Sequence, residues 1–295
     1  MEVTFGDFFL SQGTVYRTFT NYHEVDGFYG HPLYSVEGKI LRKLQTKKEG
    51  FRFVPEKVIQ EVFVSRKPQN IKDEGLDFVL EELSAFGVKD IRITGAELLK
   101  DYGFKKEKES KLSDIDLLVC GEKDVAIFKE NYMRLYKGKY SSYHTDPELL
   151  YKLQYRRKHK SHIEMDLQTI KYFESRKPIG NYLGTHINVT PSYIIANYKH
   201  EILEDYGFHE VSGTITGDSQ AFCLPGYYEV SCPKYPEVSK LKSNIFFFLI
   251  GMNHIGSHFS TKARVLKIRS LEGDEYILEV HSRWSTDLSL NVWRA

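Results

Sequence analysis

Two aspartates, Asp114 and Asp116, lie one residue apart in the segment SKLSDIDLLVCG, whose other central positions are aliphatic. Because side chains alternate between the two faces of a strand, residues i and i+2 project from the same face, so the two carboxylates are expected to be neighbours. Their repulsion raises the pKa of one carboxyl group unless a counter-charge is present, and a hard divalent cation such as Mg²⁺ or Mn²⁺ supplies one. The pair therefore predicts a metal site.

A third carboxylate and a phosphate-binding turn complete the pattern. The segment HIEMDLQTI (162–170) has the character of a strand and offers Asp166, with Glu164 on the same face as a solvent-facing or supporting residue. Upstream, the segment KDIRITG is expected to form a strand that ends in Gly95, and a short helix is expected to begin at Ala96. Backbone N–H groups at such a turn are suited to a phosphate.

This arrangement resembles the DNA polymerase beta-like nucleotidyltransferase superfamily, whose signature runs from a Gly-Ser turn through a short helix to an Asp-x-Asp strand and on to a further acidic residue. The resemblance covers residues 76–170. It implies an α+β fold, in which the nucleotidyltransferase core is a small mixed sheet with flanking helices. It also implies transfer of a nucleoside monophosphate from an NTP, ATP included, to a hydroxyl acceptor with release of pyrophosphate.

The resemblance also assigns roles to individual residues. Asp114, Asp116 and Asp166 would be the catalytic residues and would bind two ions of Mg²⁺ or Mn²⁺, and Gly95 with Ala96 would hold the outer phosphates. The family's usual serine is Ala96 here, which removes one hydroxyl contact worth about 0.5–1.5 kcal/mol. The loop between Ala96 and Asp114 is longer than is usual for the family, and its excess, KKEKESK, is expected to be a solvated insertion.

A cationic run, YRRKHK, precedes the Asp166 segment. Cations at the end of a helix commonly form a solvated surface. The alternative is that they contact the triphosphate or an anionic acceptor, and the candidates for that role are Arg156, Arg157, Lys158 and Lys160.

Three domains are expected along the chain. Residues 1–70 alternate aromatic and β-branched residues around glycines and predict a β-rich N-terminal unit, and residues 176–295 predict a β-rich domain of sandwich or small-barrel type. Residues 71–175 form the expected core. Within it the apolar spacing predicts helices over 76–86, ending at Gly87, and over 122–136 and 146–160. The segments GDFFLSQGTVYRTF and SGTITGDSQAFCLPGYYEV also resemble segments that flank the same core in uncharacterised archaeal nucleotidyltransferases.

Composition favours a soluble cytoplasmic protein with no membrane partner. Of 295 residues, 41% are hydrophobic and 14% aromatic, which is typical of a globular protein and not of disorder. The three cysteines include no CxxC pair, and the most apolar stretch, NIFFFLIGM, is much shorter than the ~20 residues of a membrane span. The net charge of +1 gives no global attraction to nucleic acid.

Several alternatives stay open on the sequence alone. The acceptor can be an RNA, a protein (as for toxin-antitoxin nucleotidyltransferases) or a small molecule. The runner-up function is a non-catalytic nucleotide- or RNA-binding protein that keeps the nucleotidyltransferase fold, and Ala96 favours it. His254 and His258 have the spacing of two metal ligands on a helix, although neighbouring glycines disfavour a helix there. Some aromatic residues can form either a base-stacking surface or ordinary core: Tyr227, Tyr228, Trp284 and Trp293.

Overall fold

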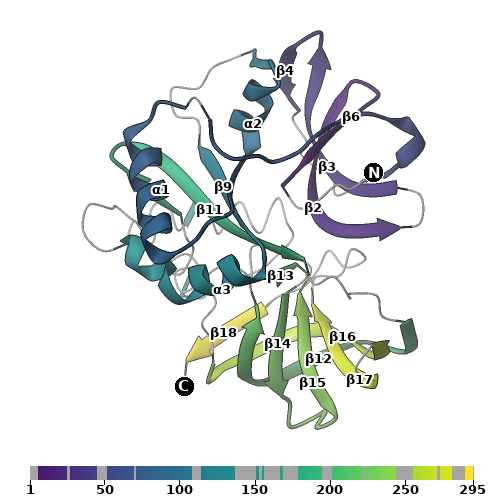
Figure 1. Cartoon of the computed structure of the whole chain (residues 1–295). Coiled ribbons are helices and arrows are strands. Elements are labelled where there is room, and N and C mark those ends of the chain that lie inside the picture. Colours follow the sequence, from purple (N-terminus) through teal and green to yellow (C-terminus); the bar gives the residue numbers. More distant parts are fainter. Residues whose placement is uncertain are drawn as a thin grey trace. The chain divides into compact units, whose positions relative to one another are not determined.

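The chain forms two compact units (Figure 1). Unit 1 comprises Met1–Ser142 and Pro178–Tyr193, and unit 2 comprises Tyr143–Lys177 and Ile194–Ala295. The three-domain division of the sequence stays a prediction. The structure, a computed structural model, describes residues 6–24, 27–44, 52–69, 71–107, 114–136, 151–152, 155, 167–168, 179–194, 201–221, 223–224, 226–243, 255–270, 273–280 and 290–294.

The N-terminal sheet of unit 1 is an antiparallel meander with two later strands added to it. Its strand order is β6-β1-β2-β3-β4-β8, and β5 pairs with the first residues of β3. A short 3₁₀ helix, η1 (Glu56–Val58), connects β5 to β6. The strands are β1 (Phe8–Ser11), β2 (Thr14–Glu24), β3 (Gly27–Glu37), β4 (Ile40–Lys43), β5 (Arg52–Pro55), β6 (Ile59–Phe63) and β8 (Lys105–Lys106).

The second sheet of unit 1 carries Asp116, and its strand order includes β10-β11-β9-β7. β9 is antiparallel to β7 and parallel to β11, so each of its edges is paired. β10 and β11 form a hairpin whose two turn residues, Leu183 and Gly184, both have positive φ, as a tight type I′ turn requires. The strands are β7 (Ile91–Thr94), β9 (Ile115–Cys120), β10 (Ile179–Tyr182) and β11 (Thr185–Ile194).

Apolar spacing predicts two of the helices of unit 1, over 76–86 and 122–136, whereas most of the helix predicted over 146–160 lies outside the described residues. The prediction over 76–86 is confirmed by α1 (Glu74–Phe86). Asp73 caps the start of this helix, because its carboxylate accepts the Leu76 N–H, and Gly87 caps its end in the left-handed conformation (φ +97°). The others are α2 (Gly95–Asp101), α3 (Glu122–Asn131) and the 3₁₀ helix η2 (Tyr132–Tyr136). Among the described residues, no helix is long and apolar enough to cross a membrane.

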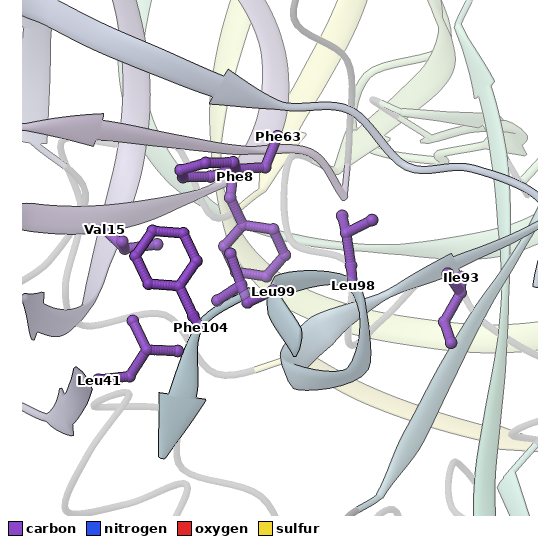
Figure 2. Close-up of a cluster of buried hydrophobic side chains, with 8 residues drawn as sticks. All are labelled: Phe8, Val15, Leu41, Phe63, Ile93, Leu98, Leu99 and Phe104. Atoms are coloured by element: carbon purple, nitrogen blue, oxygen red, sulfur yellow. The ribbon is translucent and has the colours of Figure 1, made fainter. Parts of the chain in front are cut away.

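A buried apolar cluster joins the N-terminal sheet to α2 and β7. Figure 2 shows its side chains, with Phe8, Leu99 and Phe104 directed toward one another. Phe63 and Phe104 contact edge to face, with ring centroids 5.3 Å apart. The cluster makes the sheet and α2 one packed body, and it consists of Phe8, Val15, Leu41, Phe63, Ile93, Leu98, Leu99 and Phe104.

Unit 2 contains a β-barrel. Its strands run β12-β14-β15-β17-β16, and β16 pairs again with β12, which closes the ring, while β18 extends the sheet beside β16. The β15–β17 pair is parallel and the other pairs are antiparallel. The strands of this sheet are β12 (Glu201–Gln220), β14 (Gly226–Ser231), β15 (Val238–Ser243), β16 (Ser257–Ser270), β17 (Gly273–Val280) and β18 (Leu290–Arg294). The two-residue strand β13 (Cys223–Leu224) is not part of it.

The predicted fold class is wrong. The sequence predicts an α+β protein built on a nucleotidyltransferase core with flanking helices, whereas the described residues lie mostly in strands of three large sheets. Helical periodicity correctly identifies α1 and α3, and the Gly95 turn identifies α2, but such a local signal reports nothing beyond the helix itself. It does not reveal the partner, and for α2 that partner is the N-terminal sheet.

The apolar cluster predicts a sharp contrast between adjacent residues at the end of β6. Phe63 is fully buried in the cluster, and Val64 is 42% exposed. We expect Phe63→Ala to lower the free energy of unfolding of the full chain by about 3–5 kcal/mol, because it removes a buried ring and leaves a cavity. Val64→Ala, the control, should cost less than about 1 kcal/mol. Urea denaturation followed by circular dichroism and tyrosine fluorescence measures both, and equal losses would contradict the described packing.

Candidate functional site

The candidate site lies in unit 1, where β9 begins. Asp116 faces Thr94 of β7 on one side and Asn188 of β11 on the other, at the same level of the sheet. Asp114 immediately precedes β9, and its side chain is 64% exposed. Because residues two apart share a face of a strand, the Asp114–Asp116 pair and the His186–Asn188 pair run side by side along the same face.

Asp114 contacts a histidine of the neighbouring strand. The Nδ1 atom of His186 lies 2.9 Å from Oδ1 of Asp114, and the His186 side chain is 20% exposed. The hydrogen bond from His186 is the main cause that lowers the pKa of Asp114 below its usual value. Lys106 and Lys43 lower that pKa further, and partial burial acts in the opposite direction. Asp114 is therefore held as a carboxylate at neutral pH.

Asp116 has two polar neighbours that come from distant parts of the sequence. Its Oδ1 accepts a hydrogen bond from the Asn188 side-chain amide at 3.1 Å, and its Oδ2 lies 3.5 Å from Nη1 of Arg17 on β2. The Arg17 and Asp116 side chains are 15% and 20% exposed. Arg17 is the counter-charge of this carboxylate, and the guanidinium also lies 5.8 Å from the centre of the Phe8 ring.

Gly95, the residue predicted to bend the chain toward a phosphate, lies directly against Asp116. It is the first residue of α2 and has a φ of +71°. A Cβ atom at this position would lie 2.5 Å from Oδ2 of Asp116, so only glycine allows the carboxylate to approach the turn. Ala96 follows in the first turn of α2, which has only 7 residues and therefore a weak helix dipole.

Basic groups from the N-terminal sheet surround the two carboxylates. Lys43 on β4 and Lys106 on β8 both act electrostatically on Asp114, and their strands are adjacent. Tyr34 of β3 is also close: burial raises its pKa, and the charges of Arg17 and Asp116 act on that pKa in opposite directions. The site thus has two acids at its centre, with one arginine and two lysines around them.

Several residues predicted from the sequence cannot be placed. Asp166, Arg156, Arg157 and Lys160 lie outside the described residues, as do Glu164 and Lys158. Leu167 and Gln168 are helical, whereas the sequence predicts a strand over 162–170. The neighbour of β9 on the side away from β7 is β11. The polar side chains that this strand brings beside the aspartates are His186 and Asn188, not a carboxylate.

The donor set suits one divalent cation held jointly with a phosphate ligand. Oδ1 of Asn188 is buried and has no hydrogen-bond partner, so a cation would satisfy it. In the part of the chain that the structure describes, no group of three or more His, Cys, Asp or Glu side chains is spaced to hold a metal alone. Mg²⁺ commonly binds through one or two carboxylates plus substrate phosphates, and Asp114 and Asp116 match that mode.

Cys120 does not offer a reactive thiol beside the candidate site. Cys120 ends β9, and burial raises the pKa of its thiol to about 12. Since the thiolate is the reactive form, Cys120 is inert near neutral pH.

Other candidates from the sequence lie in unit 2. His258 is in β16, a strand, and its Nδ1 lies 3.1 Å from the Thr214 hydroxyl, whereas His254 lies outside the described residues. Tyr228 is 1% exposed and packs as core, and Tyr227 is half-buried. Trp293 belongs to β18, and Trp284 lies outside the described residues.

Sequence reasoning missed Arg17, His186 and Asn188. His186 and Asn188 do carry a local signal, the alternation of polar and buried apolar residues. In THINVT they alternate with the buried Ile187 and Val189, as the aspartates alternate with Ile115 and Leu117. No local signal links this segment to β9, since 72 residues separate Asn188 from Asp116.

Comparison with known proteins identifies no family for this chain. No protein-family model, no curated protein and no solved structure matches the chain. The function must therefore be argued from the residues of the site.

The close approach of Gly95 to Asp116 yields a matched pair of variants. Gly95→Ala and Gly103→Ala each force alanine into a positive φ (+71° and +84°), which costs about 1–2 kcal/mol. Only at Gly95 would the new methyl group meet Asp116, because nothing lies within 4 Å of a Cβ at Gly103. We expect Gly95→Ala to lose clearly more unfolding free energy than Gly103→Ala in urea denaturation. Equal losses would show that Asp116 does not occupy the space above residue 95.

Proposed function

We propose that unit 1 binds a divalent cation together with a nucleoside triphosphate and transfers the nucleoside monophosphate to a hydroxyl acceptor. The observation that carries the proposal is the pair of carboxylates, Asp114 and Asp116, on one face of the sheet at the Gly95 turn, with Arg17 beside them. Two acids suit a cation, and the surrounding bases suit a polyphosphate. Mg²⁺ or Mn²⁺ is the expected cofactor, as one ion or as two.

The bases support binding of the triphosphate. A metal–triphosphate complex remains negatively charged, so it needs cations of the protein around the acids that hold the metal. Arg17 presents a planar guanidinium at the site, and Lys43 and Lys106 act on Asp114 from β4 and β8. These three residues would serve the role for which the sequence also offers Arg156, Arg157 and Lys160, which lie outside the described residues.

The proposed reaction is an in-line displacement at the α-phosphorus. The acceptor hydroxyl loses its proton and forms a new P–O bond, while the bond between the α-phosphorus and the bridging oxygen breaks and pyrophosphate leaves. A bound cation would neutralise charge that develops on the phosphate oxygens. Asp114 and Asp116 would hold the ion, and Arg17 would orient the phosphates.

A second candidate function is nucleotide binding without transfer. Two observations favour it: Ala96 replaces the serine of the family, and the strand next to β9 brings an imidazole and an amide rather than a third carboxylate. Both candidates predict NTP binding. They differ only in whether pyrophosphate is released.

Charge pairing in the described strands of unit 2 argues against a nucleic-acid acceptor bound along those strands. Several basic side chains of these strands are engaged with acids: Lys242 with Glu279 at 2.8 Å, Lys240 with Glu275 at 2.8 Å and Lys267 with Glu204 at 3.5 Å. A phosphate backbone would have to displace these carboxylates. The strand order alone does not imply a ligand, because one fold serves many functions. RNA, protein and small molecule all remain candidate acceptors.

The aspartates give the first functional prediction. We expect the full chain with Mg²⁺ or Mn²⁺ to release pyrophosphate from an NTP, and to transfer α-³²P label to RNA, protein or small molecules of a cell extract. Asp114→Asn and Asp116→Asn should each reduce both signals about a hundredfold or more, because the ion contributes several kcal/mol to the transition state. Glu81→Gln, an exposed acid of α1, is the control. Undiminished transfer in both variants would refute the proposal, and NTP binding without any pyrophosphate release would select the second candidate.

Arg17 gives the second functional prediction. We expect Arg17→Gln to weaken binding of a fluorescent, non-hydrolysable NTP analogue about ten- to a hundredfold, because a charge-assisted hydrogen bond contributes about 1.5–3 kcal/mol. Binding is measured by fluorescence anisotropy with Mg²⁺ present, and circular dichroism checks that the variant is folded. Arg134→Gln, an exposed arginine of η2, should bind as the wild type does. Unchanged or tighter binding by Arg17→Gln would show that Arg17 only balances Asp116.

A further inference from the structure

We propose that Arg17 keeps the cation away from Asp116 until a triphosphate binds, so that the ion enters the site with the nucleotide or after it. The inference rests on the proposed function and deepens it, because it names what regulates entry of the cation. The guanidinium and the cation compete for one carboxylate, and the phosphates relieve that competition by giving the guanidinium another partner.

The two carboxylates of the site differ in how freely a cation can reach them. The Asp114 side chain is 64% exposed, whereas that of Asp116 is 20% exposed. Each oxygen of Asp116 already accepts a hydrogen bond, Oδ1 from the Asn188 amide at 3.1 Å and Oδ2 from Nη1 of Arg17 at 3.5 Å. A cation that uses both acids must therefore displace a donor from Asp116. Of the two donors, Arg17 is the one whose charge repels the ion.

The burial of Arg17 makes that repulsion effective. Its side chain is 15% exposed, and partly buried charges are screened by salt much less than charges on the surface. The guanidinium also lies 5.8 Å from the centre of the Phe8 ring, at the edge of the apolar cluster. Arg17 is therefore held beside Asp116, where it lowers the affinity of the empty site for a second positive charge.

The contact between Arg17 and Asp116 is nevertheless suited to exchange. It joins one nitrogen to one oxygen at 3.5 Å. In the same unit, Arg92 binds Asp90 through two nitrogens, Nε at 2.9 Å and Nη2 at 2.7 Å. Paired short hydrogen bonds of this kind are the stronger ones, and phosphate accepts a guanidinium in the same way. A triphosphate can thus offer Arg17 a better partner than Asp116 does.

Binding of the nucleotide and of the cation should therefore be coupled. Among the described residues, no group of three or more His, Cys, Asp or Glu side chains could hold a metal ion alone. A triphosphate changes this in two ways, because it brings oxygen ligands and it draws Arg17 from Asp116. By linkage, the nucleotide raises the affinity for the ion by the same factor by which the ion raises the affinity for the nucleotide.

The test measures binding of Mn²⁺ to the full chain, with and without a non-hydrolysable NTP, from the electron paramagnetic resonance signal of the free ion. We expect the analogue to raise the Mn²⁺ affinity of the wild type at least about tenfold. Without nucleotide, Arg17→Gln should bind Mn²⁺ at least about tenfold more tightly than the wild type, because Asp116 loses its competing charge. A merely structural arginine would not produce this gain.

Two further variants establish the cause of the gain. In the double variant Arg17→Gln/Asp116→Asn the gain should vanish, since no carboxylate is left for Arg17 to cover. Arg134→Gln removes the same charge from an exposed position of η2 and should bind Mn²⁺ as the wild type does. An equal gain in Arg134→Gln would mean that only the net charge of the chain matters, which overturns the inference.

The outcomes separate this inference from the proposed function. If NTP transfer depends on Asp116 but Arg17→Gln binds Mn²⁺ no more tightly than the wild type, Arg17 does not block the ion and the proposed function stands. If Arg17→Gln gains Mn²⁺ affinity through Asp116 but the wild type releases no pyrophosphate, the blocking role stands and transfer fails. A wild-type affinity for Mn²⁺ that the NTP analogue changes less than about threefold refutes the coupling. That measurement needs no variant, so it decides even if Arg17→Gln does not fold.

Discussion

The candidate site exists only while the N-terminal sheet stays packed against α2 and β7. Arg17 and Tyr34 come from that sheet, whereas Asp116 and Gly95 come from the segment that the apolar cluster joins to it. Thr94 of β7 adds a hydrogen bond to the N-terminal segment, because its hydroxyl donates to the carbonyl of Gly6, which precedes the buried Asp7. Without this packing, Asp116 would face water with no counter-charge, and the acid pair would lose its surrounding bases.

Two kinds of electrostatic environment distinguish the units. In unit 1 the carboxylates of Asp114 and Asp116 share their surroundings with several partial partners, at distances from 2.9 to 3.5 Å. In the barrel, Lys242 and Glu279 are 2% and 9% exposed and form a close pair. A buried pair of this kind strongly destabilises the fold when one member is removed, which is typical of a structural element. The looser set in unit 1 can exchange its partners for a ligand at lower cost.

Local features of the fold were predictable from the sequence, and distant pairings were not. The helix ending at Gly87 follows from apolar spacing and a left-handed glycine, both of which act within a few residues. The strand that carries Asp116 follows from alternation. The mistaken α+β class and the missed His186 have a common cause. Which strands pair depends on contacts between residues far apart in sequence, and a strand pattern identifies no partner.

The late return of β11 to unit 1 has a consequence for synthesis of the chain. β9 is made early, and the edge that pairs with β11 lacks this partner until β11 emerges from the ribosome more than sixty residues later. An open edge flanked by Leu117 and Val119 is a template for pairing with other chains. A nascent or truncated chain that ends before residue 179 would therefore combine an aggregation-prone edge with an incomplete candidate site.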